Sequence, residues 1–183
     1  QQIGCKASTI DHSQSVLTTG MITDESNQAS WTKAMQQAYL AWWVEGYKLN
    51  RDVKIRIDAI PTLDISENEK KSMTGETAYI RAFTNLALAK RYGGLPLIKG
   101  VQDYNGNIED LKVPRSTEKE TWDFILEECD RAIENLPVSW TDGDRRATKW
   151  AALALKSRAA LFAASVAKYW NEAPLSGDAV DNK

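Results

Sequence analysis

A helix-start signal that occurs twice constrains the fold of this chain more than any other feature. A hydroxyl residue is followed three positions later by glutamate in Ser66-Glu67-Asn68-Glu69, and the pattern recurs from Thr117 to Glu120. In such a capping box the hydroxyl oxygen accepts a hydrogen bond from the third helical amide, and the glutamate accepts one from the amide of the hydroxyl residue. We therefore predict helices that begin directly after Ser66 and Thr117.

Apolar side chains recur at steps of three and four residues behind both signals, which is typical of helices that bury one face. The stripe behind Ser66 consists of Tyr79, Ala82, Phe83, Leu86 and Ala89. The stripe behind Thr117 consists of Trp122, Ile125, Leu126, Cys129, Ala132, Ile133 and Leu136. Pro137 then ends the second of these helices, because proline cannot continue a helical hydrogen-bond ladder.

The first of these helices has a strong stop signal in Tyr92-Gly93-Gly94-Leu95-Pro96. Lys90 and Arg91 suit the partly negative carboxyl end of a helix, and Gly93 can take a left-handed conformation without a Cβ clash. We expect the chain to turn sharply away from the helix here. Residues 100–114 follow as a loop rich in turn-forming residues.

An earlier helix is predicted to begin behind Ser30, with an apolar line of Trp31, Ala34, Met35, Ala38, Trp42 and Leu49. A second aromatic line, through Tyr39, Trp43 and Tyr47, indicates that both faces are covered by neighbours or by a ligand. Residues 53–57 alternate between apolar and polar, which fits a strand, whereas Leu49, Val53, Ile57 and Ile60 fit a continuing helix equally well. We interpret this segment as helix, ended by Pro61.

A fourth helix is predicted from about Ala147, with Ala151, Leu155, Ala159, Phe162, Val166 and Tyr169 on one line. Small side chains along it let a neighbouring helix approach closely, which suits antiparallel pairing. The sequence therefore predicts an all-α fold of helical hairpins, and its length predicts one domain over residues 1–183. Residues 171–183 are expected to fray as a tail.

Composition excludes several classes of function. The formal net charge is −2, from 23 basic and 25 acidic residues, and no basic block is present, so nucleic acid is not an expected partner. No apolar run approaches the roughly 18 to 20 residues that cross a bilayer. Cys5 follows a small residue as in a bacterial lipid-attachment site, but Gln2 stands where such sites have an aliphatic residue, and we interpret Cys5 as an incidental or buried thiol.

Residues for chemistry are scarce. His12 is the single histidine, which leaves no partner for a nucleophilic serine or cysteine and too few ligands for zinc. We expect no catalytic residue, no metal and no cofactor. The carboxylates of Glu127-Glu128 and Asp130, and of Asp142-Gly143-Asp144, leave a glycosidase pair open, although a solvated charged face is the favoured interpretation.

Aromatic residues provide the best candidates for a binding site. Seven tryptophans are present, and flat aromatic faces suit the C–H surface of a sugar ring. Trp122 and Trp150 fit helix stripes, whereas Trp31 and Trp140 lie at or near loops and are the better ligand candidates.

Three blocks of sequence carry a resemblance to a known family. They are Gly75-Glu76-Thr77-Ala78-Tyr79-Ile80-Arg81-Ala82-Phe83 with Arg91-Tyr92-Gly93-Gly94-Leu95-Pro96-Leu97-Ile98; Arg115-Ser116-Thr117 leading to Ala132-Ile133-Glu134-Asn135-Leu136-Pro137; and the segment from Arg146 to Arg158. Upstream, Gly20-Met21-Ile22-Thr23-Asp24-Glu25 agrees as well. Together they resemble the SusD/RagB family of outer-membrane nutrient-binding lipoproteins, over about residues 20–170.

The resemblance implies a helical scaffold in a tetratricopeptide-like arrangement. It implies a protein that is not an enzyme and that binds an oligosaccharide, a polysaccharide or another nutrient at the cell surface of a Gram-negative bacterium. The expected partner is a SusC-like TonB-dependent transporter, and the expected anchor is a lipid upstream of this segment of the outer-membrane lipoprotein. Because family members are much longer, the chain is expected to be an N-terminal or internal portion.

The resemblance also implies site residues. Carried over by position, the loop from Asp24 to Trp31 is the part expected to touch sugar, through Asp24, Asn27 and Trp31. Arg81 and Glu76 are interpreted as paired polar groups that hold their helix. The alternative function, a helical scaffold for protein–protein interaction, stays open.

Overall fold

The structure is a computed structural model that describes residues 42–100, 102, 106–141 and 145–169. Its internal contacts divide the chain into two units, Gln1–Glu45 and Gly46–Lys183. The second unit carries nearly all the described residues. The single domain over residues 1–183 stays a prediction, and the tail 171–183 lies outside the described residues.

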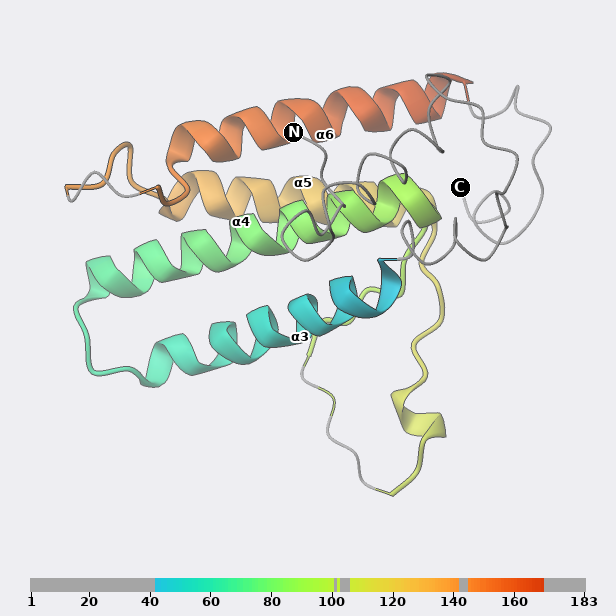
Figure 1. The fold of residues 1–183 in the computed structure, drawn as a ribbon, viewed down its shortest axis with the longest axis horizontal. Coiled ribbons are helices and arrows are strands. Elements are labelled where there is room, and N and C mark those ends of the chain that lie inside the picture. Colours follow the sequence, from blue (N-terminus) through green and yellow to red (C-terminus); the bar gives the residue numbers. More distant parts are fainter. Residues whose placement is uncertain (1–41, 101, 103–105, 142–144, 170–183) are drawn as a thin grey trace, which may run out of the picture. The chain divides into compact units, whose positions relative to one another are not determined.

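Four α-helices are described: α3 (Trp43–Ala59), α4 (Glu67–Tyr92), α5 (Glu118–Asn135) and α6 (Lys149–Tyr169). Short 3₁₀ turns occur at η1 (Ile60–Thr62) and η2 (Glu109–Leu111), and the described residues contain no strand. Successive helices run in opposite directions, so each forms a hairpin with the next (Figure 1). The predicted all-α fold of helical hairpins is therefore confirmed.

The segment that fitted either a strand or a helix is the second half of α3. Its alternation has no structural meaning, because Val53 is 5% exposed whereas Ile55 is 47% exposed. Val53 and Ile60 face the interior at a helical spacing, and Pro61 lies in η1, where the helix ends. The start of the earlier predicted helix, from Ser30 to Gln37 and beyond, lies outside the described residues.

Both predicted capping boxes are present. The Glu69 amide donates to Ser66 Oγ at 3.3 Å, and the Ser66 amide donates to Glu69 Oε2 at 3.0 Å. Thr117 and Glu120 repeat the arrangement at the start of α5, at 3.2 and 2.8 Å. These bonds satisfy amides that a helix start leaves without partners.

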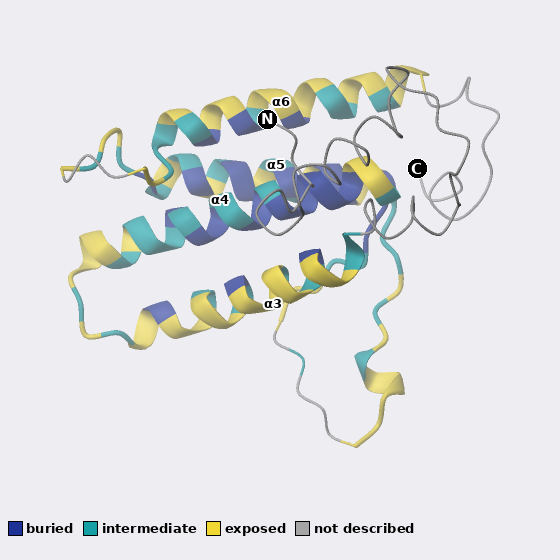
Figure 2. Cartoon of the chain, viewed as in Figure 1, coloured by how far each residue is buried: buried dark blue, intermediate teal, exposed yellow. Residues whose placement is uncertain are grey.

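The core lies between α4 and α5, whose facing sides carry most of the residues coloured as buried (Figure 2). Leu88 of α4 and Ile125, Cys129 and Ala132 of α5 are all 0% exposed. Gly75 lets α4 approach the end of α5 closely, since a Cβ there would lie 2.8 Å from the Leu136 amide nitrogen. This interface joins the two helices that the capping boxes start.

Two glycines shape the corner after α4, each for a different reason. Gly93 has φ 69° and ψ −133° and donates its amide to Ala89 O at 2.9 Å, so it closes the helix with a positive φ that suits glycine. Its ψ places it outside the left-handed helical region that we predicted. Gly94 lets two backbone segments approach closely, because a Cβ there would lie 2.2 Å from the Ser116 carbonyl oxygen.

Helix α6 buries only Ala152, Leu155 and Ala159. Trp150 is 60% exposed and Leu161 is 74% exposed. Of the predicted line, Leu155 and Ala159 are buried and Phe162 packs against Trp122 of α5 at 5.4 Å between ring centroids, whereas Tyr169 is 53% exposed. Among the described helices, α6 alone has the length and hydropathy of a membrane span, a test that helices of soluble proteins also pass.

The polar residues of α4 hold it to other elements. We interpreted Arg81 and Glu76 as paired polar groups, and each is paired, although not with the other. Arg81 forms a buried ion pair with Glu128 of α5. Glu76 receives two hydrogen bonds from Arg146, at 2.8 and 2.7 Å. The first pair joins α4 to α5, and the second joins α4 to the chain just before α6. They therefore hold α4 to its neighbours.

Candidate binding pocket

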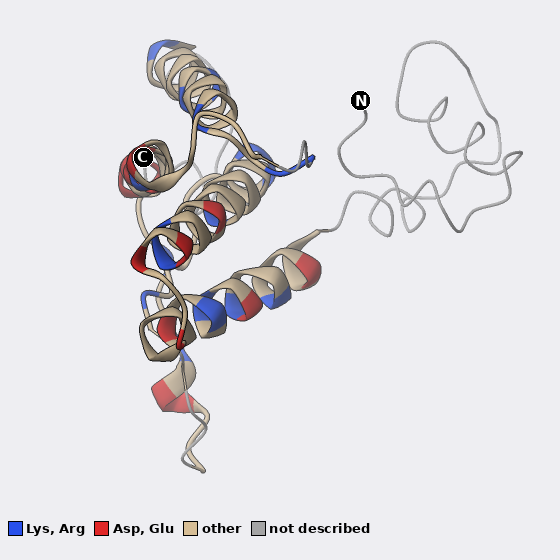
Figure 3. Cartoon of the chain, turned by 90° about the vertical axis from the view of Figure 1, so that its left-hand side faces the viewer, with Lys and Arg blue, Asp and Glu red and all other residues tan. Residues whose placement is uncertain are grey.

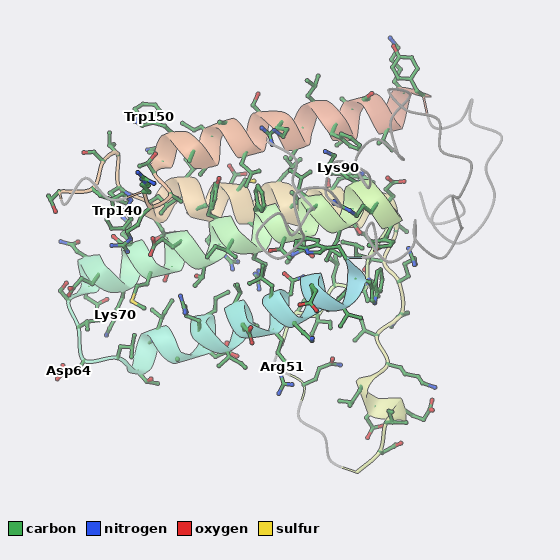
Figure 4. All side chains as sticks on the ribbon, in the orientation of Figure 1. Arg51, Asp64, Lys70, Lys90, Trp140 and Trp150 are labelled. Carbon is green, nitrogen blue, oxygen red and sulfur yellow. The ribbon has the colours of Figure 1, made fainter. Side chains whose placement is uncertain are left out.

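Of the residues predicted to bind a ligand, the structure describes Trp140 only. Asp24, Asn27 and Trp31 lie outside the described residues, and their role stays a prediction. Trp140 precedes α6 and is half-buried against the small apolar cluster formed by Ala78, Ala132, Leu136 and Ala152. Figure 4 labels it beside the start of α6.

Two interactions already occupy Trp140. Its ring nitrogen donates to the Ala147 carbonyl at 2.9 Å. The guanidinium carbon of Arg146 lies 3.6 Å from the ring centroid, so one face of the indole carries a cation–π contact. A sugar that stacks on Trp140 would therefore have to use the other face or displace Arg146.

A pocket of about 340 Å³ lies elsewhere, between α3, α4, α5 and the chain that follows α4. This volume is at the lower end of the roughly 300 to 1,000 Å³ that is usual for small-ligand sites. Its polar residues come from α3, from α4 and, through Gln102, from the chain after α4, and its apolar residues come from that chain and from α5. Walls of apolar groups with a few convergent polar groups are typical of binding sites.

Helix α3 contributes Tyr47, Asn50, Arg51 and Lys54 to the pocket. These positions follow the three- and four-residue spacing of one helix face. Figure 3 shows acidic as well as basic residues along this helix, so the charge at the pocket is a local feature of one face. Figure 4 shows Arg51 extending from α3 beside the loop between α4 and α5, whose Gly100 and Gln102 also line the pocket.

Apart from Arg51, the residues that α3 contributes to the pocket already form hydrogen bonds or ion pairs. The Tyr47 hydroxyl donates to the Pro96 carbonyl at 3.0 Å, and burial raises the Tyr47 pKa, against a smaller opposing effect of Arg115. Tyr47 therefore stays neutral. Lys54 Nζ lies 2.6 Å from Asp58 Oδ1. Arg51 is exposed and makes no hydrogen bond or ion pair with the described part of the chain.

Helix α4 supplies the floor of the pocket with Arg81 and Asn85, which are 8% and 4% exposed. Asn85 exchanges amide hydrogen bonds with Asn50 at 3.2 and 3.3 Å and also donates to the Arg81 carbonyl at 2.8 Å. The Arg81 guanidinium lies 5.1 Å from the centroid of the Phe124 ring. The amide pair therefore ties α3 to α4 beside the pocket.

The apolar wall is held in place by the corner after α4. Leu95 is 0% exposed, its amide donates to Thr121 Oγ1 at 3.0 Å, and its carbonyl accepts from the Ser116 amide at 3.0 Å. Arg115 donates to the carbonyls of Tyr92 and Gly94 at 2.7 and 2.8 Å. Leu97 and Ile98, which follow directly, line the pocket.

A second, more open hollow of about 520 Å³ shares Lys54, Arg81, Leu97 and Phe124 with the pocket. Four carboxylates line it, from Glu120, Asp123, Glu127 and Glu128. Hydrogen bonds from Thr117 lower the Glu120 pKa, and Glu128 is committed to its ion pair with Arg81. A glycosidase acid needs a raised pKa, and Glu120 has the opposite shift. Asp142 to Asp144 lie outside the described residues.

Sequence reasoning found one side of the pocket in part. The aromatic line through Tyr47 indicated a covered face of α3, and Tyr47 does line the pocket. The pocket itself was missed, because its residues come from segments far apart in the chain. The spacing of Tyr47, Asn50, Arg51 and Lys54 was the available signal.

Comparisons with known proteins match this arrangement. The SusD-like family that is described as "Starch-binding associating with outer membrane" matches residues 4–161. A SusD-like protein from Bacteroides fragilis is 40% identical, with a TM-score of 0.64 over 73% of this chain. The chain belongs to the SusD-like family.

Other solved structures share the fold at lower identity. A "Laminarin binding SusD-like protein" is 21% identical, with a TM-score of 0.61 over 76% of this chain and 31% of its own length. The "Surface glycan-binding protein A from Bacteroides fluxus" is 19% identical, with a TM-score of 0.59 over 73% of this chain and 28% of its own. The chain spans 27% of the length of the Bacteroides fragilis relative. A search of curated proteins found no match.

Proposed function

We propose that the protein binds an oligosaccharide or polysaccharide at the outer surface of a Gram-negative bacterium and delivers it to a SusC-like TonB-dependent transporter. Membership of the SusD-like family over residues 4–161 carries this proposal. Two structural neighbours, a laminarin-binding SusD-like protein and a surface glycan-binding protein, support the same ligand class. A lipid anchor upstream of this segment would hold the protein at the outer membrane.

Binding rather than catalysis fits the described residues. The polar groups around the pocket are amides, a phenol and cations, and of the nearby carboxylates Glu120 caps α5 and Glu128 joins an ion pair. Apolar walls can contact the C–H faces of a sugar while amides and cations bind its polar edge. Release of reducing sugar by the purified protein would contradict a purely binding role.

Affinity gel electrophoresis of the full chain against a panel of plant and host glycans tests the ligand class. We expect at least one glycan to retard the protein. Alanine variants of Asp24, Asn27, Trp31 and Trp140 then test the predicted site residues, and those that touch sugar should migrate faster in that gel. If no glycan retards the protein, the proposed ligand class is wrong.

The transporter is tested separately. Detergent extracts of the native outer membrane should yield a large barrel protein that copurifies with this one. A protein that fractionates without any barrel would not be a delivery subunit.

A helical scaffold for protein–protein interaction is the second candidate. The exposed apolar residues of α6, Trp150, Leu153 and Leu161, favour it. In that case Trp150→Ala would weaken capture of a protein partner while glycan retardation stays unchanged.

A further inference from the structure

We propose that the pocket between α3, α4 and α5 binds an acidic sugar, with the carboxylate or sulfate of one sugar unit paired to Arg51. This inference rests on the proposed function and adds the chemical class of the glycan. It follows from the charge balance of the pocket, from the donors that remain unused, and from the shape of its walls.

The charge balance leaves one cation without a counter-ion. Three basic side chains line the pocket, from Arg51, Lys54 and Arg81, and none of its described lining residues is acidic. Asp58 neutralises Lys54 at 2.6 Å, and Glu128 neutralises Arg81. Arg51 has no such partner in the described part of the chain. A ligand with a single negative charge per bound unit would complete the balance.

The nearby carboxylates of η2 do not supply that charge. Leu111 of η2 lines the pocket, but its neighbours do not. Glu109 accepts from Lys112 Nζ at 2.7 and 2.8 Å. Asp110 accepts from the side-chain amide of Asn107 at 3.0 Å. Asp52 is adjacent to Arg51 in α3, where consecutive side chains do not face each other.

Unused donors of other residues line the same pocket as Arg51. A guanidinium offers five N–H groups in a planar fork that matches a carboxylate or sulfate, and all five of Arg51 are available. Lys54 uses one N–H for Asp58, so two remain. Asn50 donates one N–H to Asn85, which leaves one N–H and one acceptor position for a hydroxyl group.

Four apolar residues also line the pocket: Leu97, Ile98, Leu111 and Phe124. A ring with apolar C–H faces and a charged substituent at its edge is complementary to a lining that combines these residues with Arg51. A small inorganic anion would leave the apolar residues uncovered, and an uncharged sugar would leave Arg51 without a counter-ion. An acidic sugar unit both covers the apolar residues and supplies a counter-ion to Arg51.

Isothermal titration of the full chain with matched ligands tests the proposal. The probes are a short oligogalacturonate and its methyl ester, and a sulfated carrageenan oligosaccharide and its desulfated form. We expect the acidic member of at least one pair to bind about fivefold to tenfold more tightly than its neutral partner, as one exposed charge-assisted pair allows. The pair that discriminates identifies the carboxylate or the sulfate as the preferred group. The preference should fall as salt is raised, because Arg51 is exposed.

Variants locate the effect. Arg51→Gln should remove the preference for the acidic ligand, and Arg51→Lys should keep part of it, since lysine keeps the charge and loses the fork. Arg56→Gln is the matched control, because Arg56 is an exposed arginine of α3 that does not line the pocket. Unchanged helical circular dichroism would show that each variant is folded.

The outcomes separate this inference from the proposed function. Binding of neutral and acidic glycans with equal affinity would overturn the acidic preference and leave glycan binding in place. If Arg51→Gln still prefers acidic over neutral ligands, the acidic group does not bind at Arg51. Failure of every glycan in the wider panel would overturn the proposed function and this inference with it.

Discussion

Replacing Glu128 with glutamine should destabilise the protein severely, because it leaves the buried cation of Arg81 without its counter-ion. The two side chains are 9% and 2% exposed. Removal of one partner from a buried ion pair typically costs about 3 to 5 kcal/mol. That is a large share of the roughly 5 to 15 kcal/mol that stabilises an ordinary domain.

The magnitude should be at the lower end of that range. Glu128 Oε1 also lies 3.2 Å from Arg131, whose side chain is 49% exposed, and water can solvate Arg131 once the carboxylate is gone. Arg81 has no such alternative, and its Nε is buried without a partner in the described part of the chain. We therefore expect a loss of about 3 kcal/mol and a fall in the melting midpoint on the order of 10 °C for a chain of this size.

Urea unfolding followed by helical circular dichroism measures this loss. The control is Glu127→Gln, which removes an exposed charge from the position directly before Glu128 and should change the free energy of unfolding by less than about 0.5 kcal/mol. The double variant Arg81→Met/Glu128→Leu should recover most of the loss, since an apolar pair of similar size avoids the desolvation penalty. A loss below about 1 kcal/mol for Glu128→Gln, or a double variant no more stable than the single one, would refute the reasoning.

Three further predictions concern the corner, the caps and the thiol. Gly94→Ala should lower the free energy of unfolding by at least about 2 kcal/mol, because its Cβ would lie 2.2 Å from the Ser116 carbonyl oxygen, whereas Gly100→Ala, with open space around it, should be tolerated in the same urea assay. Hydrogen bonds from Ser66 lower the Glu69 pKa, so the cap stabilises the fold fully above the unfolded pKa of about 4.3 and loses this effect as pH falls through the lower folded pKa. Ser66→Ala should therefore cost about 1 kcal/mol at neutral pH and progressively less in acid, and an equal cost at both pH values would contradict it. Burial raises the pKa of the Cys129 thiol to about 11, so in a Cys5→Ser background a thiol reagent at neutral pH should label Cys129 only at the rate of unfolding, and rapid labelling of the folded protein would contradict its burial.

The sequence predicted the parts of the fold that depend on local signals. Ser66 and Thr117 start α4 and α5 where the capping boxes placed them, because the bonds that define a box join residues three positions apart. The end of α4 at Gly93 is equally local. The second half of α3 was ambiguous because its periodicity fits two structures, and only the burial of Val53 and Ile60 decides between them.

The candidate site could not be predicted in the same way. Arg81 and Glu128 are separated by 47 positions, and Asn50 and Asn85 by 35. No local sequence pattern predicts such pairs. The burial of Arg81 and Asn85 on α4 therefore becomes visible only in the packed structure. The pocket depends on the same long-range contacts. Trp140 was chosen for its place near a loop, and the contact with Arg146 that covers one ring face could not be read from spacing.

The bonds that fix the corner after α4 have a consequence for binding rates and energies. The Leu95 amide donates to Thr121 of α5 and the Leu95 carbonyl accepts from Ser116 just before α5, so the segment that carries Leu97 and Ile98 is held in place before any ligand binds. A ligand that meets a finished surface avoids the entropy loss of organising it. Loosening these hydrogen bonds, for example with Thr121→Val, should therefore weaken capture without altering a single atom that the ligand touches.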